Sequence, residues 1–333
     1  MSDFASLLND FQKSAAERED PRQTKQSRPF KRQRIFNQSE SSPNDVHLLS
    51  VKIDFLCIGA QKAGTTWLHE MLRKIPELGL PENTKEVHFW DWHRRKGLGW
   101  YSKQFPQSHK NLLLGEITPC YMALKEHDVK EIHKLFPDAR IIFIARDLVE
   151  RAWSALTMEL RNEARGLKAG EFDIAYEEMN AATRNKLQHD SDPKNYTDDF
   201  FMERLQNWTH TARSDYASGL KLWLKYFSCD QILILNYNDI SEKPKEFLTL
   251  VLKHIRLKDI EDVLETHLTT KELAQRFNAT ISPSCSIRPS LRTKMELHLR
   301  EYAIDFNTLL DQNWPNSNLK LDEYPQGLLK FPK

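Results

Sequence analysis

Four short apolar runs stand out along the chain, and each has the character of a buried β-strand. The runs are IDFLCIG at 53–59, NLLLGE at 111–116, ARIIFIAR at 139–146 and QILILNY at 231–237. Continuous apolar character, without alternation of polar residues, is typical of strands that are covered on both faces, as in a parallel sheet. We therefore predict a central sheet built from these segments.

Apolar residues recur at helical spacing between and after these runs. The pattern predicts helices over 65–74, 147–165, 216–227, 244–255 and 291–310. Pro244 suits the first turn of the fourth helix. Strands that alternate with helices predict an α/β fold, with a mostly parallel central sheet flanked by helices on both faces. Ligands of such sheets bind at the carboxyl ends of the strands.

The first part of the chain lacks this periodicity. Residues 1–45 are polar and are predicted to form a disordered or loosely ordered arm, while residues 46–333 form a single domain. The basic cluster at 31–34 is typical of a solvated tail more than of a polyanion contact. The N-terminus has no apolar stretch behind a basic start, so we expect no secretory signal and a cytoplasmic location.

Composition excludes several classes of protein. The 48 basic and 47 acidic residues nearly cancel, so net charge gives no argument for nucleic acid or a membrane surface. No run approaches the roughly 18 apolar residues of a membrane span. Four widely spaced cysteines, with no C-x-x-C pair, argue against a zinc site and a disulfide framework.

The strongest chemical signal is the segment GAQKAGTTW at 59–67, between the first strand and the first helix. Its small residues Ala63 and Gly64 let backbone N–H groups approach an anion, and the helix N-terminus adds partial positive charge. Lys62 supplies a point charge, and the hydroxyls of Thr65 and Thr66, next to Trp67, donate hydrogen bonds. The order of lysine and hydroxyl differs from the Walker A motif. The alternative is an ordinary strand–turn–helix junction.

The loop resembles the 5′-phosphosulfate loop of sulfotransferases that use 3′-phosphoadenosine 5′-phosphosulfate (PAPS). Within that superfamily the chain is similar to the heparan sulfate N- and 3-O-sulfotransferase branch. The resemblance extends from about residue 51 to 312 and includes KEVHFWDW at 85–92, GLGWY at 97–101, GEITPCY at 115–121, RDLVERAWS at 146–154, and RPSL and REY around the last helix. It implies the P-loop-like sulfotransferase fold.

The resemblance also implies roles for individual residues. Glu86 is expected to be the general base that takes the acceptor's proton, assisted by His88 and Asp91, although His88 is a rival base. Without the resemblance, Lys85 and Glu86 would be a solvated ion pair beside a half-buried histidine. We assign Lys62 to the charge that develops on the leaving phosphate. PAPS is the expected donor and 3′,5′-ADP the product, with no metal.

The expected nucleotide site combines the loop with two later segments. Residues 62–67 would hold the 5′-phosphosulfate, and Arg146 and Ser154 the 3′-phosphate. Arg288, before the final helix, would replace part of a basic segment that the branch carries there. The alternative for Arg146 is a local pair with Asp147.

The chain departs from the branch at positions that bear on the acceptor. Ile117 and Thr66 stand where the 3-O-sulfotransferases have basic residues, which argues against a heavily anionic glycan. The sequence leaves open a sugar, phenol, lipid or peptide acceptor, and it does not give the oligomeric state. Trp90, Trp92, Trp100 and Tyr101 could stack on an acceptor or pack in the core. The competing hypotheses are a nucleotide-dependent phosphotransferase and a non-catalytic nucleotide-binding module.

Overall fold

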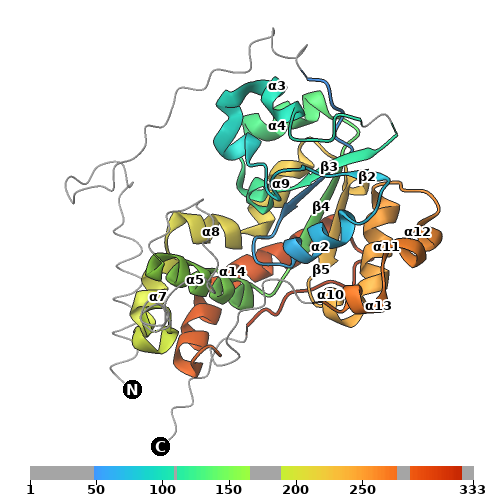
Figure 1. Ribbon diagram of the computed structural model, residues 1–333. Coiled ribbons are helices and arrows are strands. Elements are labelled where there is room, and N and C mark those ends of the chain that lie inside the picture. Colours follow the sequence, from blue (N-terminus) through green and yellow to red (C-terminus); the bar gives the residue numbers. More distant parts are fainter. Residues whose placement is uncertain (1–48, 109–110, 166–188, 276–285, 325–333) are drawn as a thin grey trace, which may run out of the picture. The chain divides into compact units, whose positions relative to one another are not determined.

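The computed structural model describes residues 49–108, 111–165, 189–275 and 286–324 (Figure 1). The arm predicted for residues 1–45 lies outside the described residues. None of the described helices is long and apolar enough to cross a membrane.

A five-stranded sheet forms the centre of the described chain, and all of its strand pairs are parallel. The strands are β1 (Phe55–Gly59), β2 (Leu78–Gly79), β3 (Leu113–Ile117), β4 (Arg140–Ala145) and β5 (Ile232–Asn236), in the order β2-β3-β1-β4-β5. The four predicted strands are confirmed. The additional strand, β2, has two residues and is too short to leave a periodic signal in the sequence.

The described helices include the five predicted ones, with ends shifted by at most three residues, and others that were not predicted. They are α2 (Thr65–Leu72), α3 (Gly97–Ser102), α4 (Glu126–Leu135), α5 (Leu148–Ala164), α7 (Asp198–Leu205), α8 (Trp208–Ser214), α9 (Tyr216–Leu224), α10 (Asp239–Glu242), α11 (Pro244–His254), α12 (Ile260–His267), α13 (Thr270–Leu273) and α14 (Pro289–Asn313). Pro244 begins α11 as predicted. The helix predicted over 216–227 ends at Leu224, yet Phe227 is still buried.

Helices cover both faces of the sheet, as the alternation of elements predicts (Figure 1). On one face α2 packs against α11, where the ring of Trp67 meets Phe247 edge-on at a centroid distance of 5.7 Å. On the other face the ring of Phe143 in β4 contacts Tyr216 of α9 at 5.0 Å and Phe306 of α14 at 6.4 Å. These aromatic contacts fix the helices over the central strands.

The strand register brings the carboxyl ends of the central strands to one edge. Cys57 of β1 pairs with Ile117 of β3, and Ala145 of β4 pairs with Asn236 of β5. The segments that follow β1, β3, β4 and β5 therefore emerge side by side. This edge is where ligands of open parallel sheets bind, so it is the place to look for a site.

Candidate active site

The loop between β1 and α2 has the backbone shape of an anion cradle. Lys62 and Gly64 both take left-handed conformations, with φ of 69° and 80°. A Cβ atom at Gly64 would lie 2.3 Å from Cδ1 of Ile240, so only glycine fits there. No side chain caps the first turn of α2. Its N–H groups are therefore suited to an anionic ligand.

Lys62 is held in a strongly positive environment. Burial, together with the charges of Arg161 and Arg146, lowers the pKa of its ammonium to about 8. Its Nζ lies 3.5 Å from the sulfur of Met158 on α5. The ammonium of Lys62 and the guanidinium groups of Arg161 and Arg146 lie near one another, which favours the binding of a negatively charged group at this position.

Arg146, at the end of β4, lies directly against this loop. Its Nη1 donates to the carbonyl oxygen of Lys62 at 2.6 Å, and its guanidinium lies 4.4 Å from the ring centroid of Tyr237. Its Nε is buried and has no hydrogen-bond partner in the described chain. Ser154 shares a face of α5 with Met158, which contacts Lys62, because residues four apart are neighbours on a helix. The structure thus brings Arg146 to the loop and places Ser154 one turn before Met158 on α5.

Two predicted nucleotide residues have other contacts in this structure. The indole N–H of Trp67 donates to the carbonyl of Leu273 at 3.2 Å, and its ring lies in the core. Arg288 donates from Nε and Nη2 to Asp198, and from Nη1 to the carbonyl of Tyr196. Its donors are therefore engaged at the start of α7.

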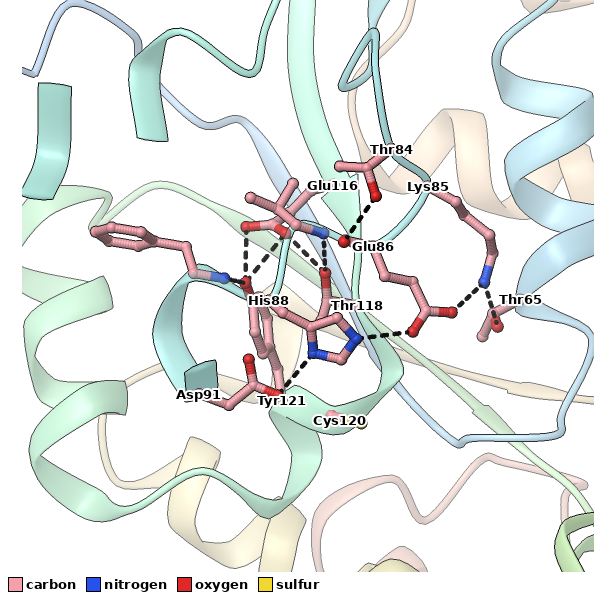
Figure 2. A network of polar contacts seen from close by, with 12 residues as sticks. Thr65, Thr84, Lys85, Glu86, His88, Asp91, Glu116, Thr118, Cys120 and Tyr121 are labelled. Atoms are coloured by element: carbon pink, nitrogen blue, oxygen red, sulfur yellow. Dashed lines mark hydrogen bonds and ion pairs between the residues drawn. The ribbon is translucent and has the colours of Figure 1, made fainter. Parts of the chain in front are cut away.

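Four charged side chains form a chain of contacts on the acceptor side of the loop (Figure 2). Lys85 Nζ donates to Glu86 Oε1 at 2.6 Å and to the hydroxyl oxygen of Thr65 at 3.4 Å. His88 lies between two carboxylates, with Nε2 3.2 Å from Glu86 and Nδ1 2.8 Å from Asp91. The segment of residues 85–91, called the acceptor-side segment below, therefore contacts the first residue of α2 through Lys85.

The contacts set opposite charges on Glu86 and His88. Burial opposes the ionisation of Glu86, but the hydrogen bond with His88 and the charge of Lys85 outweigh it and lower its pKa to about 2. Burial likewise opposes the charge on His88, yet Asp91 and Glu86 raise its pKa to about 9. At neutral pH the pair is a carboxylate and an imidazolium, so Glu86 is the member able to accept a proton.

The backbone of residues 85–88 does not stay extended at His88. This residue has φ of 51°, in the left-handed region, and begins the π-helical turn Phe89–His93. The carbonyl oxygen of His88 accepts hydrogen bonds from the N–H groups of Trp92 and His93. Glu86 and His88 nevertheless meet, because this turn, rather than strand alternation, brings the imidazole back to the carboxylate.

The aromatic residues after Glu86 divide into core and surface. Trp90 and Tyr101 are buried, and Trp100 is partly buried against the core. Trp92 is 52% exposed, and its ring stacks on the His88 imidazole at 3.7 Å with an interplanar angle of 5°. Of these four residues, Trp92 is the one placed to meet an acceptor.

A cleft of about 480 Å³ opens along α2, next to Lys85. It is lined by charged, amide and apolar side chains, among them His69, Glu70, Arg73, Glu82, Asn83 and Lys85. Both signs of charge are present, so the cleft lacks the uniformly positive lining that a polysulfated chain would favour. Ile117 is fully buried.

Two contributors to the site escaped sequence reasoning. Lys85 appeared only as the partner in a Lys–Glu pair, but the structure makes it the link to Thr65. Tyr237 ends the fourth apolar run and lies under Arg146. Its position at the carboxyl end of a predicted strand was the available signal.

The prediction of a metal-free site stays a prediction. Within the described ranges, His88, Asp91 and Cys120 each bring one possible ligand atom within 4.8 Å of the others. Burial raises the pKa of the Cys120 thiol to about 11, which favours the neutral thiol over a metal-binding thiolate.

Comparison with known proteins gives a consistent match. The family profile described as "Sulfotransferase domain" matches residues 52–291. Membrane-associated sulfotransferase kil1 of Dictyostelium discoideum is 24% identical over 311 residues, covering 74% of this chain and 64% of the relative. Heparan sulfate glucosamine 3-O-sulfotransferase 5 of Mus musculus is 26% identical over 298 residues, covering 84% and 80%.

A solved structure matches at the level of the fold. The sulfotransferase from Alicyclobacillus acidocaldarius superposes with a TM-score of 0.52 and 17% identity, covering 78% of this chain and 96% of that one. The two chains therefore share the same fold.

Proposed function

The chain belongs to the sulfotransferase family and is a transferase of that type, and we propose that it uses PAPS to sulfate a hydroxyl or amine with Glu86 as the base. The bond between the sulfuryl sulfur and the bridging oxygen of the 5′-phosphosulfate breaks. The acceptor's oxygen or nitrogen forms the new bond to sulfur from the opposite side. The acceptor's proton passes to the Glu86 carboxylate, and 3′,5′-ADP leaves.

The observation that carries this proposal is the position of Glu86 between Lys85 and His88, close to the start of α2. Lys85 contacts both Glu86 and Thr65, so the base lies beside the expected phosphosulfate. His88 is already protonated at neutral pH and is poorly suited to act as the base. A bound sulfuryl group would share the charge of Lys85, which would raise the pKa of Glu86 and strengthen it as a base.

The donor site has a division of labour in this proposal. Lys62 and the N–H groups of the first turn of α2 would bind the 5′-phosphosulfate and stabilise the charge on the bridging oxygen. Arg146 and Ser154 would bind the 3′-phosphate. Arg146 has a buried Nε without a partner in the described chain, which supports this assignment.

We further propose that the acceptor is a carbohydrate of low charge. The relatives named above include one whose name specifies heparan sulfate glucosamine. The cleft beside Lys85 mixes acidic and basic residues, and the half-exposed Trp92 offers an aromatic face to a sugar. A screen of labelled PAPS against neutral and sulfated sugars, phenols, lipids and peptides tests the class. The cytoplasmic location expected from the sequence stays a prediction.

The deciding experiment compares single-turnover transfer by Glu86→Gln and His88→Asn, each saturated with PAPS. We expect Glu86→Gln to lose on the order of a hundred- to ten-thousand-fold in rate, because glutamine cannot take the proton. Its affinity for 3′,5′-ADP should be retained or somewhat higher, because Glu86 would no longer compete with the nucleotide for Lys85. Near-normal turnover by Glu86→Gln, together with an inactive His88→Asn, would make histidine the base.

A thermal-shift comparison separates the competing functions. A PAPS-dependent enzyme should be stabilised by 3′,5′-ADP more than by ATP with magnesium, since ligands stabilise the state that binds them. Preferential stabilisation by magnesium ATP would favour a phosphotransferase. Binding of 3′,5′-ADP without transfer to any acceptor would favour a non-catalytic module.

A further inference from the structure

A buried carboxylate lies behind the acceptor-side segment without touching any of the charged residues described above. Glu116, at the end of β3, is fully buried. Three hydroxyl groups donate to it: Tyr101 at 2.6 Å, Thr118 at 2.8 Å and Tyr121 at 3.2 Å. Figure 2 shows the contacts of Thr118 and Tyr121 with the carboxylate. A buried carboxyl group needs such hydrogen-bond partners. Two of these partners also contact the backbone of a neighbouring segment.

Two of these hydroxyls also hold the backbone on either side of His88. The Thr118 oxygen accepts the N–H of Val87 at 3.2 Å, and the Tyr121 oxygen accepts the N–H of Phe89 at 2.9 Å. Each hydroxyl has a single proton. When that proton is donated to Glu116, only oxygen lone pairs face the two backbone N–H groups. The carboxylate thus orients both hydroxyls so that they accept from the two backbone N–H groups.

The backbone between these two hydrogen bonds contains the left-handed residue His88. His88 has φ of 51°, and a left-handed conformation is strained at a residue with a side chain. Such a conformation persists when its surroundings over-determine it. The hydrogen bonds at Val87 and Phe89 lie immediately before and after His88, so they restrain the residue from both sides.

We propose that Glu116 is a positioning residue, which acts through the Thr118 and Tyr121 hydroxyls to hold His88 between Glu86 and Asp91. It does not touch the reacting groups. The imidazolium that it places holds Glu86 in its ionised form, so the effect on catalysis is indirect. The link to catalysis rests on the function proposed above, whereas the effect on His88 does not.

Removal of one hydroxyl at a time tests the proposal against a purely structural role. Tyr121→Phe deletes the hydroxyl that holds the N–H of Phe89. Tyr101→Phe is the matched control, because Tyr101 donates to the same carboxylate but accepts none of the described hydrogen bonds from the backbone at 87–90. Glu116→Gln is a third variant, in which the amide NH₂ cannot accept and one hydroxyl must turn its proton away.

The primary readout is the pKa of His88, followed by NMR titration of its imidazole. We expect Tyr121→Phe and Glu116→Gln to move this pKa from about 9 toward its ordinary value of 6.5, and Tyr101→Phe to leave it in place. Equal pKa values in Tyr121→Phe and Tyr101→Phe, or an unchanged pKa in all three folded variants, would overturn the proposal. This measurement needs no acceptor and no turnover.

The second readout is the single-turnover rate at saturating PAPS, beside the affinity for 3′,5′-ADP. Burial raises the pKa of Glu116 to about 7, although its three donors oppose the rise, so the assays are run at pH 8. Tyr121→Phe should lose at least about tenfold in rate with unchanged nucleotide affinity, which is part of the roughly hundred- to ten-thousand-fold that a positioned base contributes. Tyr101→Phe should keep its rate. An equal loss in both variants would reduce Glu116 to a structural role.

If the pKa of His88 shifts as expected but wild-type protein transfers nothing, the function proposed above fails and the positioning role stands.

Discussion

At the scale of single residues, neighbouring side chains give two lysines of the site different properties. Lys62 and Lys85 are both lysines near α2, but burial and adjacent arginines lower the pKa of Lys62, whereas Lys85 is paired with Glu86. The first is suited to bind an incoming anion, and the second to hold the base in place. The sequence alone does not separate the two roles, because both depend on contacts between distant segments.

His88 should make stability depend on pH in the alkaline range. Its folded pKa of about 9 exceeds its ordinary value of 6.5, so its contribution is complete below about pH 6.5 and is lost as the pH rises through about 9. We expect wild-type protein to lose more melting temperature between pH 7 and pH 9.5 than His88→Asn does. The difference between the two proteins isolates His88 from Lys62, which titrates in the same range with the opposite sign. Parallel losses in both proteins would contradict the raised pKa.

At the scale of elements, the ends of neighbouring strands build the site jointly. The loop after β1 is held by Arg146 at the end of β4, and Arg146 lies on Tyr237 after β5. The acceptor-side segment is held from the end of β3 through Thr118 and Tyr121. The residues that build the site therefore lie just beyond the carboxyl ends of the strands, where ligands of parallel sheets bind.

Replacement of Gly64 tests the loop as an element. Gly64→Ala would place a methyl group 2.3 Å from Ile240 and keep a φ of 80°, which costs alanine on the order of 1–2 kcal/mol before any clash. We expect the variant to fold with a lower melting temperature and to bind 3′,5′-ADP at least about tenfold more weakly, the factor that 1.4 kcal/mol represents. Gly97→Ala is the control, since its φ is 77° but nothing lies within 4 Å of an added Cβ. Equal nucleotide affinity in the two variants would contradict the role of the loop.

Replacement of Arg146 tests the end of β4. Arg146→Ala should weaken 3′,5′-ADP much more than 5′-AMP, because charge-assisted hydrogen bonds to the 3′-phosphate are made by only one of the two ligands. Isothermal titration calorimetry with both nucleotides measures the difference. Arg288→Ala serves as a comparison, since its donors are engaged by Asp198 and Tyr196. A similar loss for both nucleotides in Arg146→Ala would remove the 3′-phosphate assignment.

At the scale of the whole molecule, the sequence specifies the frame more fully than the site. Continuous apolar runs predict four of the five strands, because a strand covered on both faces must be apolar throughout. The position of the anion loop follows from the end of the first run. The reversal at His88 could not be predicted, since a non-glycine residue carries no local signal for a left-handed φ. The contacts of Glu116 join residues up to 15 positions away and reach Val87 only through Thr118.

The metal requirement is also a property of the whole protein. We expect turnover to survive EDTA unchanged, because Lys62 and backbone donors would supply the charge that a cation provides in phosphoryl transfer. Metal analysis of the purified protein should accompany the assay, since His88, Asp91 and Cys120 lie close together. Loss of activity on chelation, restored by magnesium, would favour the phosphotransferase hypothesis.

The single ammonium that joins Thr65 to Glu86 has a consequence for the order of events. Lys85 is the described link between the start of α2 and the carboxylate, at 3.4 Å and 2.6 Å. An anion that arrives at α2 competes for this ammonium, so the basicity of Glu86 should rise only once the donor is in place. By thermodynamic reciprocity, an acceptor that engages Glu86 should in turn bind more tightly to the donor-loaded protein. We therefore expect the enzyme to bind its two substrates synergistically, with the donor acting as the trigger for deprotonation.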